Sequence, residues 1–227
     1  HISRGTWTCR ILNNLTYNSI PCENYLTNDR KVEDLSAEKI RHIALIHFAR
    51  YGYEGTSLQQ IAEEVGIKKP SIYAHFKGKD NLFLSVIDYI IHLEKRRILN
   101  YFQEQKNKPL EVKLKGFLHW FENEFHTSDV AKCILRVTYF PPLKLKDEVA
   151  TLVNPFLDDM QRLLTKMLRF AQQQDELMID DIQACSLAYI TLVEGSLLEL
   201  VYGSALRYEQ RVLATWPIFW KGIQSHD

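Results

Sequence analysis

One short segment, residues 58–77, constrains the fold more strongly than any other, because it contains two short helix signals separated by a glycine turn. A hydroxyl followed three residues later by Gln, the pattern of a capping box, occurs at both Thr56 and Ser57 and predicts a helix start at about Ser57. Gly66 stops this helix, and Pro70 suits the first turn of the next one. The spacing therefore predicts two short helices joined by a tight turn.

The apolar positions of this segment support one particular packing. Ala62 is small enough to let the two helices approach closely, and four branched residues supply a shared core: Ile61, Val65, Ile67 and Ile72. Two short helices of this kind, the second polar and basic at its start, describe a helix-turn-helix reader of the DNA major groove. The alternative is a helical hairpin inside a larger bundle.

Helical periodicity continues on both sides of this segment. Ser36 is predicted to cap a first helix that Gly52 ends, with Leu35 and Ile40 as a hydrophobic staple. Gly78 is predicted to end the third helix. Beyond it we expect helices at 79–105, 110–127, 129–140, 145–174, 180–202 and 205–225.

No alternating strand pattern of any length occurs, so the fold class is predicted to be all-α: a three-helix helix-turn-helix DNA-binding domain followed by a larger helical ligand-binding and dimerisation domain. The expected domain divisions are an irregular leader, tag remnant or read-through at 1–30, the DNA-binding domain at 31–78, a connecting helix at 79–105 and the larger helical domain at 106–227.

Charge points to a local surface and not to the whole molecule. The chain has 28 basic and 28 acidic residues, so its net charge does not indicate a nucleic-acid partner. Residues 66–79, however, hold four lysines and no acid: Lys68, Lys69, Lys77 and Lys79. This basic segment coincides with the second helix of the predicted motif.

Two features place the chain in the cytoplasm. The four cysteines form no CxxC pair, which favours a reducing compartment. The longest apolar stretch, residues 187–201, is interrupted by Glu194, Ser196 and Glu199, so no membrane span or membrane partner is expected. Cys133 and Cys185 are predicted to be small core residues.

The motif and its flanks contain a dense, ordered set of short sequences: Tyr51-Gly52-Tyr53-Glu54-Gly55-Thr56-Ser57, Ile61-Ala62, Val65-Gly66-Ile67 and Ser71-Ile72-Tyr73-Ala74-His75-Phe76-Lys77-Gly78-Lys79-Asp80-Asn81-Leu82. These residues resemble the DNA-binding signature of the tetracycline-repressor (TetR) family of bacterial transcription regulators. The resemblance covers roughly residues 36–90. It implies a homodimer that binds a palindromic operator in double-stranded DNA and releases it when a small-molecule effector enters the C-terminal domain.

The resemblance also implies roles for individual residues. The positions that reach base edges are Gln59, Lys69, Pro70, Ser71 and Ala74, where Gln suits adenine and Lys suits guanine. The positions that hold phosphates are Thr56, Ser57, Tyr73, His75 and Lys79. Lys68 and Lys77 are predicted as further phosphate contacts because they belong to the local basic segment. Tyr73 and His75 have an alternative role as space-filling residues between helices. Ala74 departs from the pattern, because many family members carry a large aromatic residue there.

The C-terminal half is rich in aromatic residues, most of which are expected in the core. Four of them are predicted to bound a cavity for a flat or hydrophobic ligand: Trp120, Phe121, Phe140 and Tyr189. His119, Glu122 and His126 share one helical face, but no fourth ligand accompanies them, so neither a metal nor another cofactor is predicted. Glu194 is expected to face water at a helix edge.

The last two predicted helices are apolar on more than one face, which predicts homodimerisation through a four-helix bundle formed by both copies of this pair. The sequence contains no GxSxG, HExxH, P-loop or GxGxxG pattern, so no enzyme is predicted. The alternatives are a dimeric helical small-molecule-binding protein without useful DNA affinity, and an enzyme with an active site assembled from distant residues.

Overall fold

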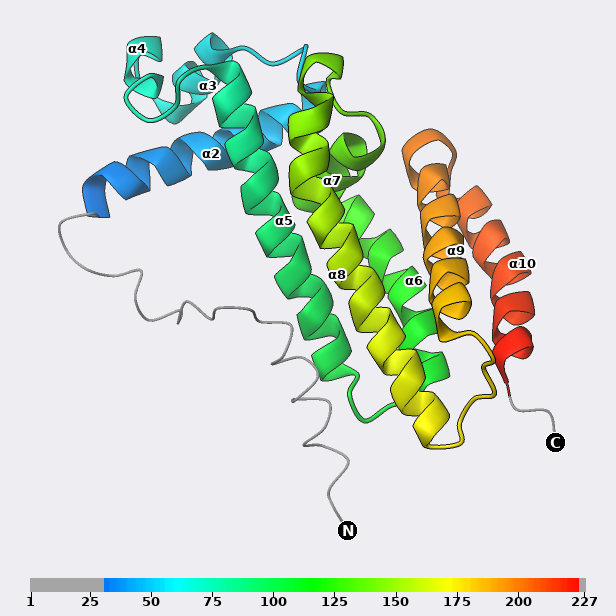
Figure 1. The fold of residues 1–227 in the computed structure, drawn as a ribbon. Coiled ribbons are helices and arrows are strands. Elements are labelled where there is room, and N and C mark those ends of the chain that lie inside the picture. The colour runs from blue at the N-terminus through cyan, green and yellow to red at the C-terminus, as the bar shows by residue number, and fades with distance from the viewer. Residues whose placement is uncertain (1–30, 225–227) are drawn as a thin grey trace. The chain divides into compact units, whose positions relative to one another are not determined.

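The computed structural model describes residues 31–224, with side chains from residue 36 onward. The described part is built of helices, which confirms the predicted all-α class (Figure 1). The elements are α2 Lys31–Tyr51, α3 Leu58–Val65, α4 Lys69–Ile72, α5 Lys79–Glu104, α6 Leu110–Thr127, α7 Asp129–Tyr139, the 3₁₀ turn η1 Leu143–Leu145, α8 Lys146–Gln173, α9 Ile182–Tyr202 and α10 Ala205–Ile223. The predicted leader, residues 1–30, lies outside the described residues.

Two predicted helix ends are wrong. The first helix starts at Lys31, so Ser36 lies inside it and does not cap it. Neither Gly nor Pro interrupts residues 31–35, and the helix therefore continues through them. The third helix ends at Ile72 and not near Gly78, because the chain then turns through shorter-range hydrogen bonds, such as the one from His75 N–H to the Ile72 carbonyl (3.0 Å).

The described residues form two compact units whose boundaries differ from the predicted domains. The N-terminal unit contains residues 31–95 and 128–154, and the C-terminal unit contains residues 96–127 and 155–224. The difference arises because α7 packs against α2 and buries Cys133, Ile134 and Val137. A helix predicted for the larger domain thus belongs to the same unit as the helix-turn-helix segment.

The core of the N-terminal unit joins α2, α3 and the first part of α5. Of the predicted shared core, Ile61, Val65 and Ile72 are buried, whereas Ile67 is half-buried; Ile40 of α2 is fully buried as well. The Phe48 ring meets the Phe83 ring edge-on, with 4.9 Å between centroids, which is a favourable aromatic geometry. This core holds α3 against α2, and α4 packs on α3 (Figure 1).

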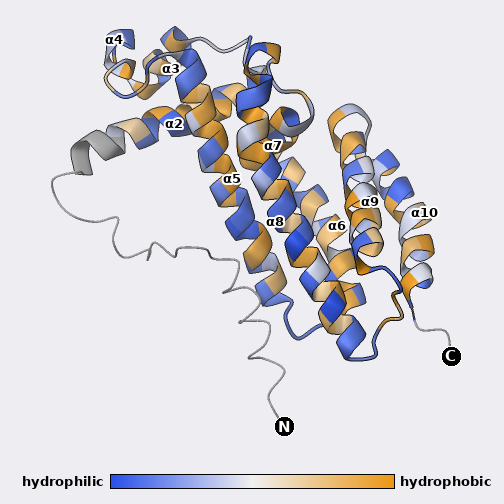
Figure 2. Cartoon of the chain, viewed as in Figure 1, coloured by the Kyte–Doolittle hydropathy of each residue, from blue (hydrophilic) through white to orange (hydrophobic). Residues whose placement is uncertain are grey.

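The C-terminal unit is stabilised by the packing of long helices and by tyrosine hydroxyls that donate hydrogen bonds to the backbone of a neighbouring helix. In this unit α9 and α10 run side by side and both pack on α6 (Figure 1). The Tyr189 hydroxyl donates to the Leu114 carbonyl and the Tyr208 hydroxyl donates to the Leu118 carbonyl, each over 2.7 Å. Hydrophobic and hydrophilic residues alternate along α8 (Figure 2), as expected of a helix with one buried face.

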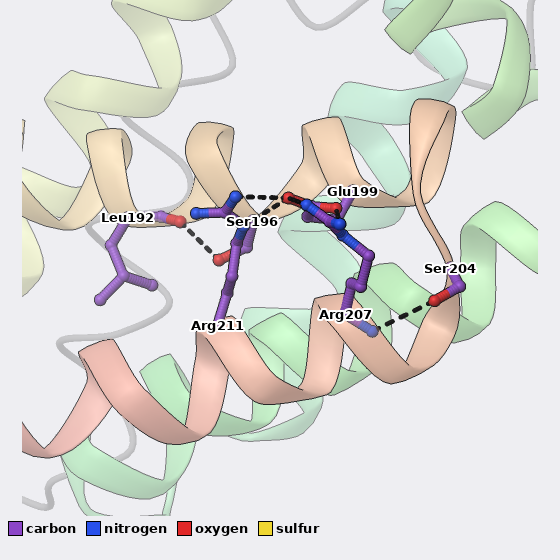
Figure 3. A network of polar contacts seen from close by, with 6 residues as sticks. All are labelled: Leu192, Ser196, Glu199, Ser204, Arg207 and Arg211. Atoms are coloured by element: carbon purple, nitrogen blue, oxygen red, sulfur yellow. Dashed lines mark hydrogen bonds and ion pairs between the residues drawn. The ribbon is translucent and has the colours of Figure 1, made fainter.

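An ion-pair network joins α9 to α10. The Glu199 carboxylate is nearly buried and accepts hydrogen bonds from Arg207 (2.7 Å) and from Arg211 (2.5 Å) (Figure 3). Ser204 caps α10 by accepting from the Arg207 N–H. These contacts lower the pKa of Glu199, because hydrogen bonds from Arg207 and then Arg211 favour the charged carboxylate.

The expectation that no segment is apolar enough to cross a membrane is wrong for α9. An 18-residue window of this helix has a mean hydropathy of 1.5, and by length and composition it meets the requirement for a span. In this fold 39% of the window is buried among other helices, and a core helix of a soluble protein passes the same test. The feature is therefore weak evidence for a membrane segment.

Candidate DNA-binding site

The start of α3 is fixed by the predicted capping box. The Ser57 hydroxyl accepts from the Gln60 N–H (3.2 Å), and the Gln60 side chain accepts from the Ser57 N–H (2.9 Å). Of the two registers that the sequence allowed, the Ser57 register is the one formed. Two of the free backbone donors at the helix start are thereby satisfied.

The turn after α3 depends on glycine. Gly66 has φ 82 and ψ 30, a left-handed conformation that costs an L-residue strain. In this conformation the Ile67 N–H reaches back to the Ala62 carbonyl (2.9 Å), and the Lys39 ammonium donates to the Val65 carbonyl (2.9 Å). The direction in which the chain leaves α3, and hence the position of α4, follows from this one residue.

The turn and α4 present a polar and basic surface. Among the described residues, Lys68, Lys69 and Lys77 are exposed and have no carboxylate within 4.0 Å. The Tyr73 side chain is 53% exposed, although large aromatic side chains are usually buried. Since Ile72 and Phe76 face the core between these residues, the outer side of the segment is free for a partner.

The structure exposes all five residues predicted to reach base edges: Gln59, Lys69, Pro70, Ser71 and Ala74. Gln59 lies in the first turn of α3, where its amide donates to Glu63 (2.7 Å). The other four lie in or just after α4. Their roles toward bases remain predictions.

The predicted phosphate contacts divide into three groups. Ser57, Lys68, Tyr73 and Lys77 are exposed, while His75 and Lys79 are half-buried. Thr56 is a correction, because its side chain is 2% exposed and its hydroxyl donates to the Gly52 carbonyl (2.8 Å). Its hydroxyl stabilises the turn before α3 and is not available to a phosphate.

A cluster that the sequence did not reveal fixes the start of α5. The Tyr53 hydroxyl donates to the Asp80 carboxylate, which also accepts two hydrogen bonds from the Lys144 ammonium (2.8 and 3.0 Å). Lys79 lies over the Tyr53 ring, 4.2 Å from its centroid. Hydrogen bonds from Lys144 and Tyr53 lower the pKa of Asp80. Tyr53, Lys79 and Asp80 belong to the family pattern, whereas nothing in the sequence signals Lys144.

A second contact that sequence reasoning missed joins α2 to α3. The Nε2 atom of His47 lies 2.6 Å from a Glu64 carboxylate oxygen, and the His47 side chain is almost completely buried. Because His47 belongs to α2 and Glu64 to α3, this pair holds the first helix of the motif against the helix before it.

The four residues of the predicted ligand cavity are divided between the two units. Phe140 lies in the N-terminal unit and is 48% exposed, whereas Trp120, Phe121 and Tyr189 lie in the C-terminal unit. Trp120 stacks on Phe117 in an aromatic core. The physical reason is that periodicity predicts burial of an aromatic residue but not which neighbours it meets.

The other polar candidates have ordinary surroundings. Within residues 31–224, no group of three or more His, Cys, Asp or Glu side chains is arranged to hold a metal ion, and His119 and His126 are exposed. Glu194 is half-buried, which raises its pKa. Burial raises the pKa of the Cys133 thiol to about 12 and that of Cys185 to about 11, so both are unreactive core residues.

Two short helices joined at a left-handed glycine, with an exposed basic face on the second, define a helix-turn-helix DNA-binding domain. Residues 40–86 match the family model described as bacterial regulatory proteins, tetR family. This segment therefore belongs to the tetR family, which confirms the resemblance found in the sequence.

Known proteins agree with this assignment. The chain is 36% identical over 78 residues to the uncharacterised HTH-type transcriptional regulator YerO of Bacillus subtilis, covering 34% of this chain and 27% of the relative. It is 34% identical over 90 residues to the HTH-type transcriptional repressor ComR of Escherichia coli, covering 39% of this chain and 42% of the relative. The chain thus spans less than half the length of these two relatives.

The likeness to solved structures extends over most of the chain. A transcriptional regulator of the TetR family from Cytophaga hutchinsonii has a TM-score of 0.69 and 19% sequence identity. The match covers 86% of this chain and 97% of that one. At this identity the likeness concerns the fold, and it includes the C-terminal helices that the family model does not reach.

Proposed function

We propose that the protein is a cytoplasmic transcriptional repressor that binds a palindromic operator as a homodimer and leaves it when a small hydrophobic or aromatic effector binds. The observation that carries the proposal is the exposed surface of α4 and of the turn before it. Lys68, Lys69 and Tyr73 are exposed there, and they follow the left-handed turn at Gly66. Ammonium groups on such a face displace counterions from phosphates, so DNA affinity should fall steeply with salt.

The proposal that the dimer forms through α9 and α10 is supported by their uncovered apolar side chains. Those that are at least half exposed are Leu187, Tyr202, Leu206, Leu213 and Ile218. Contiguous exposed apolar surface on a soluble protein marks an interaction site. A two-fold dimer would present two copies of α4 to the two halves of a palindrome, about one turn of DNA apart or slightly more.

Selection of bound sequences from a random DNA pool, with the full chain at moderate salt, tests the proposal directly. An enriched palindromic consensus is the expected result, and its half-site spacing reports the distance between the two recognition helices. If no sequence is enriched and binding is weak at all salt concentrations, the DNA role fails. The small-molecule-binding alternative then becomes the better account of the fold.

The division into base and phosphate contacts has its own test. We expect Lys69→Ala to weaken binding selectively at particular base pairs, and Tyr73→Phe to weaken binding to all sequences similarly. Both side chains are exposed, so neither change should disturb folding. Affinities for the consensus and for single-base variants of it check this, and equal losses on every sequence would contradict the division.

A further inference from the structure

A cavity of about 290 Å³ opens within the C-terminal unit, away from the aromatic residues predicted to bind a ligand. Its walls come from the end of α5, the first turn of α6 and the last turns of α8. The apolar part of the wall is formed by Phe102, Leu110, Leu163, Met167 and Phe170. The volume lies near the lower end for small-molecule sites, about 300 Å³, so the cavity suits a small apolar body.

The polar part of the wall carries more positive than negative charge. Lys106, Lys108 and Lys113 contribute ammonium groups, and Glu176 contributes the one carboxylate among the lining residues. Among the described residues, Lys113 has no carboxylate within 4.0 Å. Lys113 is half-buried, and this burial lowers the pKa of its ammonium, while the charge of Glu176 offsets part of the effect.

The backbone that carries Lys113 is held in place. The buried Tyr101 hydroxyl donates to the Lys113 carbonyl (2.9 Å), and burial raises the pKa of Tyr101 to about 12. Gly116 permits this approach, because a Cβ at that position would lie 2.6 Å from the Tyr101 hydroxyl oxygen. The cavity is therefore lined by a lysine whose backbone is held in place, together with a set of apolar side chains.

We propose that this cavity binds a small amphipathic carboxylate, with the acid group at Lys113 and the apolar body against Leu163, Met167 and Phe170. The carboxylate would accept a charge-assisted hydrogen bond from the Lys113 ammonium. Met167 gives the wall an adaptable side chain that accepts chains of different shape. The start of α6 faces the same cavity and adds the positive end of its helix dipole.

This inference deepens the proposed function, since it names the chemical class of an effector. Its regulatory consequence rests on that proposal, but binding itself does not. Calorimetry in the absence of DNA therefore tests the site independently of any operator.

Three probes with the same eight-carbon chain isolate the contribution of the head group: octanoate, 1-octanol and octylammonium. Titrated into the full chain, octanoate should bind about tenfold more tightly than octanol, and octylammonium should bind more weakly than both. Equal affinities for the three probes, or no heat with octanoate, would overturn the proposal.

Variants locate the site. Lys113→Met should reduce octanoate affinity about tenfold and leave octanol affinity unchanged, while Lys113→Arg should retain the preference for the anion. Lys115→Met is the matched control, because Lys115 lies on the same helix, is exposed and does not line the cavity. A loss from Lys115→Met equal to that from Lys113→Met would assign the effect to general surface charge and refute the site.

A final measurement separates the site from the repressor proposal. Octanoate should release operator DNA from the unmodified protein and not from Lys113→Met. If octanoate binds but the DNA stays bound, the site stands and the release step of the proposed function fails. If the protein binds its operator but not octanoate, the repressor proposal stands and this inference fails.

Discussion

The α3–α4 segment and the α9–α10 pair are both two helices joined by a short connection, yet they are stabilised in opposite ways. The short pair is defined locally, by a capping box at Ser57 and a left-handed turn at Gly66. The long pair is defined by distant contacts, such as the hydrogen bond from Tyr208 to the α6 backbone. The outer face of α4, in the short pair, is polar, whereas the long pair α9–α10 exposes apolar side chains. The two faces therefore suit different partners, a polyanion and a second apolar surface.

The largest expected effect comes from the core beneath the short pair. Ile61→Ala should lower the free energy of unfolding by about 2–5 kcal/mol, because the fully buried side chain leaves a cavity. Chemical denaturation followed by circular dichroism measures this loss. Ile218→Ala in α10 is the control, since Ile218 is 77% exposed and its removal should leave the stability of the single chain unchanged. A large loss at Ile218 would mean that a second copy covers it.

Glycine substitutions extend the comparison, because Gly→Ala should lower the free energy of unfolding in the short pair and raise it in the long pair. Gly66→Ala should destabilise by about 1–2 kcal/mol through the left-handed backbone, although an added Cβ would meet no atom within 4 Å. Gly195→Ala, inside α9 and equally open, should stabilise by about 0.5–1 kcal/mol. Thermal and chemical unfolding measure both. A loss at Gly195 that grows on dilution would indicate a close contact with a second chain.

Removal of the two helix caps should cost similar stability but have different functional effects. Ser57→Ala and Ser204→Ala each remove an N-cap hydroxyl, with an expected loss of about 1 kcal/mol. Only Ser57→Ala should also weaken DNA binding, since that side chain is exposed at the start of α3 and is one of the predicted phosphate contacts. Unfolding curves paired with DNA titrations check this, and a matching loss of DNA affinity in Ser204→Ala would break the distinction.

The smallest expected effect is on the stability of the fold at acidic pH. Hydrogen bonds lower the pKa of Asp80 in one unit and of Glu199 in the other. A carboxylate with a lowered folded-state pKa contributes stability above its unfolded-state pKa, and that contribution is lost as the pH falls through the folded-state pKa. Asp80→Asn and Glu199→Gln should each flatten the acid side of the stability curve. Glu209→Gln, an exposed residue of α10, is the control and should leave the curve unchanged.

The sequence predicted most helix ends because local signals mark them. Ser57, Gly66 and Ser204 lie at helix ends in the structure, and the first two were recognised from their neighbours within a few residues. The end of α4 was missed, because the turns after Ile72 depend on short hydrogen bonds with no residue signal. The start of α2 was missed because Ser36 resembles a cap even inside a helix.

The candidate site was less predictable wherever it depends on distant residues. Exposure of Lys69 and Tyr73 follows from helical periodicity, but Thr56 lies between helices, where periodicity does not predict its burial. Lys144 is 64 residues from Asp80, so no window of sequence joins them. The four aromatic residues predicted to form one cavity are divided between the two units, since composition does not determine which of them share a core.

The packing of α7 on α2 has a consequence for synthesis. The N-terminal unit includes residues 128–154, so the ribosome must complete α6, which belongs to the other unit, before it can supply α7. Until then the face of α2 that α7 covers stays open while the nascent chain lengthens. The DNA-binding unit therefore cannot finish folding first as an independent N-terminal domain, and a product that ended before α7, ahead of Asp129, would keep this hydrophobic face of α2 uncovered.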